Sequence, residues 1–127
     1  MDYRCLFFIL LIALLGCHSQ DDNCYVLSAE DTYGVEGPDT VNVNETIKLA
    51  VSFPCWNGCG HFGEFEIIET SAFSKTVQLK TEYTGCICTM VASTQIADYY
   101  FTGSTPGNYA VNFVSGDSLI THHVLVM

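Results

Sequence analysis

Cysteine is the residue type with the most chemical potential in this 127-residue chain, which contains seven of them. Two belong to the N-terminal region, and the remaining five are Cys24, Cys55, Cys59, Cys86 and Cys88. Because so high a cysteine content is unusual in cytosolic domains, it indicates an oxidising compartment and disulfide bonds. Five is an odd number, so at least one of these thiols stays unpaired in a monomer.

The spacing of the cysteines predicts bridges between two regions of the chain. Cys55 and Cys59 flank an Asn-Gly turn, whereas Cys86 and Cys88 lie two apart on an expected strand and share one face. A bond between Cys86 and Cys88 would be strained, so each should find a partner elsewhere. We therefore expect one or two disulfides between the 55–59 loop and the 86–88 strand, with the role of Cys24 left open.

Metal binding and thiol chemistry are the alternatives for the same cysteines. The cluster Cys55, Cys59, His61, Cys86 and Cys88 has the ligand types of a zinc site but lacks the two-residue knuckles of structural zinc sites. A redox pair would favour Cys-x-x-Cys at a helix start, which the chain does not offer. A small metal- or thiol-handling protein is thus the alternative function, and we expect neither metal nor cofactor.

No residue pattern in the chain predicts catalysis. Glu64 and Glu66 share a strand face, but without a partner His or Lys motif they are expected to be solvated surface residues. His122 and His123 are adjacent on a strand and face opposite sides, so they cannot chelate one metal together. We predict that the protein is not an enzyme.

Aromatic residues near the first cysteine pair suggest a binding surface instead. Trp56, His61 and Phe62 cluster around the loop that contains Cys55 and Cys59. Aromatic side chains in loops on a rigid scaffold often form binding patches. These three residues are the candidate patch for a protein or glycan partner.

The charge of the chain limits its partners. The chain contains four Lys and Arg residues and 14 Asp and Glu residues, which gives a formal net charge of −10. A nucleic-acid-binding protein needs a basic footprint, so nucleic acid is excluded as a partner. The acidic surface favours cationic or neutral partners.

The N-terminal segment predicts export. Residues 5–15 are eleven consecutive apolar residues, which as a helix span roughly 16 Å, about half of a bilayer core. Residues 1–16 therefore have the pattern of a cleaved signal peptide. The sequence Leu14-Leu15-Gly16-Cys17 resembles the lipobox of bacterial lipoproteins, which implies acylation of Cys17 and a membrane anchor. The following segment 18–22, with Asp21 and Asp22, resembles the surface-export signal of Bacteroidetes-type lipoproteins and implies an outer-membrane location exposed at the cell surface.

Period-two alternation of apolar and polar residues dominates the rest of the chain. It is clearest over 46–53 and recurs over 40–44, 64–67, 76–83, 109–114 and 119–126, with less regular strands near 86–91 and 96–101. Short strands of this kind predict an all-β fold, an antiparallel β-sandwich over residues 39–127. Residues 17–38, acidic and without steady periodicity, are expected to be a tether with one strand near 25–27.

The segment 105–111, Thr-Pro-Gly-Asn-Tyr-Ala-Val, is followed by a turn and a last strand. It resembles the penultimate and last strands of bacterial Ig-like domains. The resemblance implies an Ig-like sandwich in which the hydroxyl of Tyr109 bonds to nearby backbone, and it carries no activity with it. The expected function is a lipid-anchored, non-catalytic binding or structural module at the bacterial outer membrane.

Overall fold

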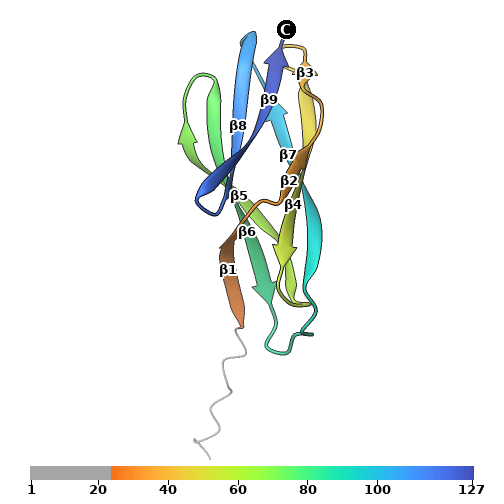
Figure 1. Ribbon diagram of the computed structural model, residues 1–127. Coiled ribbons are helices and arrows are strands. Elements are labelled where there is room, and N and C mark those ends of the chain that lie inside the picture. Colours follow the sequence, from red (N-terminus) through yellow and green to blue (C-terminus); the bar gives the residue numbers. More distant parts are fainter. Residues whose placement is uncertain (1–23) are drawn as a thin grey trace, which may run out of the picture.

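The computed structural model describes residues 24–127, which form nine β-strands and no helix (Figure 1). The strands are β1 (Tyr25–Glu30), β2 (Gly34–Glu36), β3 (Thr40–Val41), β4 (Thr46–Cys55), β5 (Gly60–Thr70), β6 (Ser74–Thr84), β7 (Ser93–Thr102), β8 (Gly107–Ser115) and β9 (Ser118–Val126). They build one six-stranded and one three-stranded sheet. The all-β prediction is confirmed.

The six-stranded sheet is organised around β6. One edge of β6 pairs with β5 along most of its length. The other edge pairs with β8 over Ser74–Val77 and with β1 over Leu79–Thr84. Strands β9 and β3 continue the sheet beyond β8. Because β6 runs parallel to β8, and β3 runs parallel to β9, the sheet is mixed. The expectation of a purely antiparallel fold was wrong, since local alternation does not report which distant strand becomes a neighbour.

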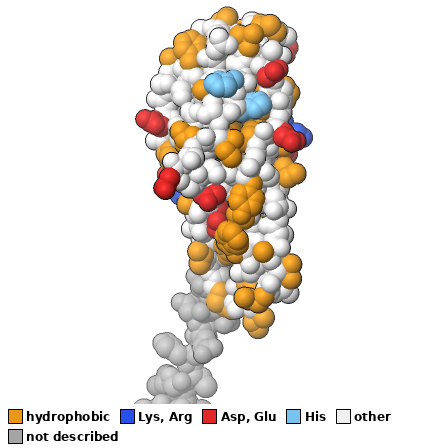
Figure 2. Space-filling view, viewed as in Figure 1, with side chains coloured by type: hydrophobic (Ala, Val, Ile, Leu, Met, Phe, Trp, Pro, Cys, Tyr) orange, Lys and Arg blue, Asp and Glu red, His pale blue; other side chains and the backbone are white. Residues whose placement is uncertain are grey.

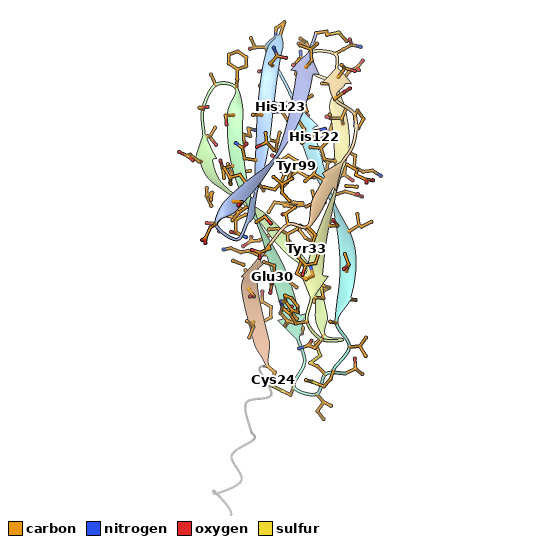
Figure 3. All side chains as sticks on the ribbon, viewed as in Figure 1. Cys24, Glu30, Tyr33, Tyr99, His122 and His123 are labelled. Atoms are coloured by element: carbon orange, nitrogen blue, oxygen red, sulfur yellow. A yellow bond between two sulfur atoms is a disulfide. The ribbon has the colours of Figure 1, made fainter. Side chains whose placement is uncertain are left out.

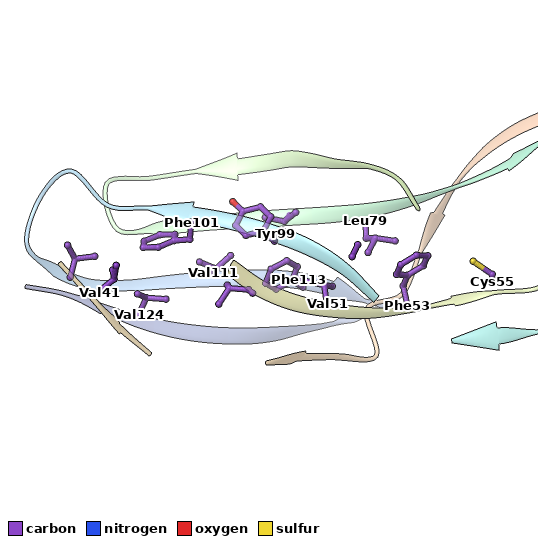
Figure 4. Close-up of a cluster of buried hydrophobic side chains, with 14 residues drawn as sticks. Val41, Val51, Phe53, Cys55, Leu79, Tyr99, Phe101, Val111, Phe113 and Val124 are labelled. Atoms are coloured by element: carbon purple, nitrogen blue, oxygen red, sulfur yellow. The ribbon is translucent and has the colours of Figure 1, made fainter. Parts of the chain in front are cut away.

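The hydrophobic core lies between the two sheets (Figure 4). Strand β4, in the middle of the three-stranded sheet β2-β4-β7, contributes Leu49, Val51 and Phe53, each fully buried. The alternate residues Lys48, Ala50 and Ser52 point away from it, as the sequence pattern predicts for a half-buried strand. The other buried apolar residues come from both sheets: Val41, Cys55, Val77, Leu79, Ala97, Tyr99, Phe101, Val111, Phe113, Val124 and Val126.

Two segments differ from their expected local structure. The strand expected near 86–91 is a loop. Residues 85–92 connect β6 to β7 and belong to neither sheet. The acidic segment 17–38 contains β1 and β2 in its described part, and these strands pair with β6 and β4 respectively. Residues 24–38 are therefore part of the two sheets.

Tyr109 lies near the start of β8 and closes one end of the core. Its hydroxyl donates to the carbonyl of Thr105 at 2.8 Å. Its ring makes edge-on contacts with Phe73 and Phe101, at centroid distances of 5.1 and 5.3 Å. The hydroxyl of Tyr109 thus forms the backbone hydrogen bond that the resemblance to Ig-like domains implies.

The proposed signal peptide 1–16 and the lipidation site Cys17 lie outside the described residues. Within residues 24–127, no helix has the length and apolar character needed to cross a membrane.

Candidate functional site

Two disulfide bonds meet at one end of the protein, where the described chain begins at Cys24 (Figure 3). Cys59 pairs with Cys88, with Cα atoms 5.4 Å apart, so a bridge does join the 55–59 loop to the 86–88 segment. Cys86 pairs with Cys24, with Cα atoms 5.0 Å apart. We call this end the tip and define it as residues 24–27, 54–60 and 83–94.

Cys55 is the cysteine left unpaired, so its nomination for a disulfide was wrong. It ends β4 with its side chain in the core and no exposed surface, whereas Cys59 lies beyond the turn and faces the 85–92 loop. Burial raises the pKa of the Cys55 thiol, and the negative charge of Glu30 raises it further. A buried, protonated thiol is a poor nucleophile, so Cys55 is a packing residue.

The thiol content gives a direct check on this arrangement. We expect a colorimetric disulfide reagent to label no described cysteine in the native protein at pH 8, and to label only Cys55 after unfolding without reductant. Because the thiolate is the reacting form and the pKa of Cys55 is raised, this buried thiol should stay unreactive in the native protein at pH 8. Rapid labelling of the native domain, or release of several thiols, would contradict the assignment.

The disulfides also bear on the metal- or thiol-handling alternative. Of the four cysteines in the predicted cluster, Cys59, Cys86 and Cys88 are held in disulfides, and Cys55 is buried in the core. Disulfide sulfur is not the thiolate that zinc requires. Among residues 24–127, no group of three or more His, Cys, Asp or Glu side chains is placed to hold a metal ion.

The structure separates the three residues of the candidate aromatic patch. Trp56 is 57% exposed at the end of β4. Phe62 packs against the core, and its ring makes an edge-on contact with Phe53 and a tilted contact with Phe65, at centroid distances of 6.2 and 4.7 Å. His61 lies on the outer face of the β5–β6 pair, where its Nε2 atom is 3.5 Å from a carboxylate oxygen of Glu82. The two-residue repeat of β5 places His61 and Phe62 on opposite faces of the sheet, so the three side chains do not share one surface.

Trp56 instead lies beside Tyr33, which is 52% exposed. Both side chains border a shallow cavity of about 180 Å³. The other residues lining it are Pro54, Cys55, Ala92, Ser93 and Thr94. This aromatic pocket, as we call it, is lined by apolar and aromatic residues together with the hydroxyl-bearing Ser93 and Thr94.

Hydrogen bonds hold Trp56 at the pocket from two sides. Its indole nitrogen donates to a carboxylate oxygen of Glu30 at 3.0 Å. Its backbone N–H donates to the hydroxyl of Tyr83 at 3.0 Å. Burial raises the pKa of Tyr83, so this hydroxyl stays protonated and neutral at physiological pH. Trp56 is thus oriented even though more than half of its surface is exposed.

Glu30 and Tyr33 were not among the candidate residues from the sequence. Both lie in the segment expected to be a tether, where β1 ends and β2 begins (Figure 3). The alternation is too short there to predict pairing with distant strands. An aromatic residue three positions after an acidic one was the only local signal.

The remaining candidates have structural roles. Lys80 lies between Glu64 and Glu66 on the outer face of the sheet, with Nζ 3.8 and 2.7 Å from their carboxylates. The hydrogen bond to Glu66 raises the pKa of Lys80, and the two acidic residues therefore surround a cation.

On β9, the Nε2 atom of His122 lies 2.9 Å from the carbonyl oxygen of Pro38.

Comparison with known proteins adds no relative. The chain matches no protein family, no curated protein and no solved structure.

Proposed function

We propose that the protein is a lipid-anchored, non-catalytic binding module at the bacterial outer membrane, built on an Ig-like β-sandwich. The anchor rests on the lipobox-like sequence ending at Cys17. The Ig-like fold is supported by two facing sheets and by Tyr109, whose hydroxyl bonds to backbone four residues upstream as in a tyrosine corner. The mixed six-stranded sheet is a departure from the antiparallel sheets of that architecture.

The aromatic pocket is the observation that carries the binding function. Glu30 accepts the indole N–H of Trp56, which lines the pocket, and forms no ion pair with any cationic side chain among residues 24–127. A carboxylate beside two exposed aromatic rings suits a cationic group, which the rings attract through their π-faces. The net charge of −10 adds long-range attraction for the same kind of partner. The pocket's ligand is therefore an Arg or Lys side chain of a protein partner.

Fluorescence of Trp56, the one tryptophan of the chain, tests this binding directly. We expect a short peptide of alternating glycine and arginine to change the emission saturably, and the matched glycine–glutamate peptide to leave it unchanged. Tyr33→Ala should weaken arginine-peptide binding about tenfold, since a desolvated cation–π contact contributes on the order of 1–2 kcal/mol.

Two further variants separate a specific site from general charge attraction. Glu30→Gln should weaken peptide binding, whereas Glu45→Gln, an exposed residue in the turn before β4, should leave it within about twofold at physiological salt. Equal losses in both variants, or a response to a neutral oligosaccharide in place of the peptide, would refute the cation site.

A further inference from the structure

The tip has a surface unlike the rest of this acidic chain. Residues 24–29, 49–60 and 83–97 contain no Asp, Glu, Lys or Arg, although the chain has 14 acidic residues. Figure 2 shows the charged side chains on the middle and upper parts of the visible face, with apolar and uncharged residues at the lower end. Among residues 24–127, the tip is the end of the molecule without Asp, Glu, Lys or Arg side chains.

The loop 85–92 exposes apolar side chains at this end to an unusual degree. Ile87 is 97% exposed, Met90 93% and Val91 64%. Tyr25 and Val26 at the start of β1 are also more than half exposed. Scattered exposed apolar residues are ordinary, but three on one short uncharged loop form a patch that calls for a partner.

The loop is held in place by covalent and hydrogen bonds. Cys86 and Cys88, on either side of Ile87, are bonded to Cys24 and Cys59. The backbone N–H of Gly58 donates to the carbonyl of Thr89 at 2.9 Å. With its backbone fixed to the body at these points, the loop presents Ile87 outward.

The Cys24–Cys86 disulfide places the exposed loop next to Cys24, where the described chain begins. Cys24 is bonded to Cys86, and the backbone N–H of Gly85 donates to the carbonyl of Cys24 at 2.9 Å. Figure 1 shows the β6–β7 loop and the start of β1 at one end of the molecule, and the C-terminus at the other. Seven peptide steps separate Cys17 from Cys24, and a chain of that length spans at most about 25 Å.

We propose that the tip rests on the phospholipid bilayer that holds the lipid anchor, with Ile87, Met90 and Val91 inserted among the headgroups. This inference rests on the proposed anchor at Cys17. An acyl chain at Cys17 confines the tip to within the tether's reach of the membrane, so the apolar loop meets the bilayer at high effective concentration. The absence of charged side chains at the tip removes the largest cost of bringing it to the interface.

Depth-dependent quenching by spin-labelled lipids tests the contact on the full-length protein in phosphatidylethanolamine and phosphatidylcholine vesicles. Trp56→Phe removes the native tryptophan, and Met90→Trp then places a reporter in the loop. Phe73→Trp, in the β5–β6 turn at the opposite end, is the matched control. Lipids labelled near the headgroup should lower emission of the Met90→Trp protein by about half and leave the control unchanged. Adding Ile87→Ser and Val91→Ser to the loop reporter should reduce its quenching.

The possible outcomes separate the inference from the anchor. Mass spectrometry of the N-terminal peptide reports acylation at Cys17, and its absence would overturn both proposals. Acylation with equal or no quenching of the two reporters would overturn only the membrane contact. A detergent-soluble dimer that Ile87→Ser and Val91→Ser abolish, with the loop reporter unquenched, would assign the patch to a second copy and refute the membrane contact.

Discussion

Replacing Cys24 and Cys86 together by alanine should lower the free energy of unfolding by about 4 kcal/mol, the chain-entropy value for a bridge of this span. The two residues are 62 positions apart, so the bond restricts more than half of the described chain in the unfolded state. It also fixes β1 against the 85–92 loop. Urea unfolding of the variant and the parent protein, both without reductant, measures the difference.

Reductant provides the control for this prediction. In strong reductant the parent loses both disulfides and the double variant loses its remaining Cys59–Cys88 bond, so their unfolding curves should converge. The bridge between Cys59 and Cys88 spans 29 positions, and its loop overlaps the 24–86 loop over residues 59–86, so the effects of the two bridges should not add. A variant that stays within about 1 kcal/mol of the oxidised parent would show that the native fold does not depend on this bond.

Phe113→Ala should destabilise the protein by about 3–5 kcal/mol, because it removes a large buried side chain and leaves a cavity. Phe113 lies on β8, fully buried between the sheets. Its ring makes edge-on contacts with Tyr99 and Phe65, at centroid distances of 5.4 and 6.4 Å. The neighbouring β-strands are tied by backbone pairing, so the cavity cannot collapse freely.

Leu119→Ala is the matched control for the core. Leu119 is the second residue of β9 and is 53% exposed, so its truncation should cost less than about 1 kcal/mol. Thermal unfolding at fixed pH compares both variants with the parent. Similar melting temperatures for the two variants would contradict the assignment of Phe113 to the core.

The core residues could be predicted from local sequence patterns, because the alternation of apolar and polar residues indicates which face of a strand is buried. In β4, the run Ile47, Leu49, Val51 and Phe53 alternates with polar or small residues, and the buried face is the one predicted. In β8, Val111 and Phe113 behave in the same way. Side-chain direction in a strand depends only on residue parity, so no long-range information is needed.

The pairing of the strands was not accessible in this way. Nothing near Ser74–Val77 indicates that β6 would run parallel to β8, since a parallel neighbour is chosen by tertiary packing. The same holds for β1, which lies in an acidic segment and pairs with the second half of β6. Most residues of β1 are exposed, so its sequence shows no clear alternation of apolar and polar residues that would distinguish a strand from a tether.

The amino-acid sequence by itself determined that this protein is all-β, that it is acidic, and that its cysteines favour disulfides over free thiols. Only the tertiary structure decided that Cys24 bonds to Cys86 and that Cys55 stays buried. It also placed Glu30 and Tyr33 beside Trp56. The physical reason is that composition and alternation act within a few residues, whereas a bond or a pocket requires distant segments to meet, and that meeting depends on the packing of the whole chain.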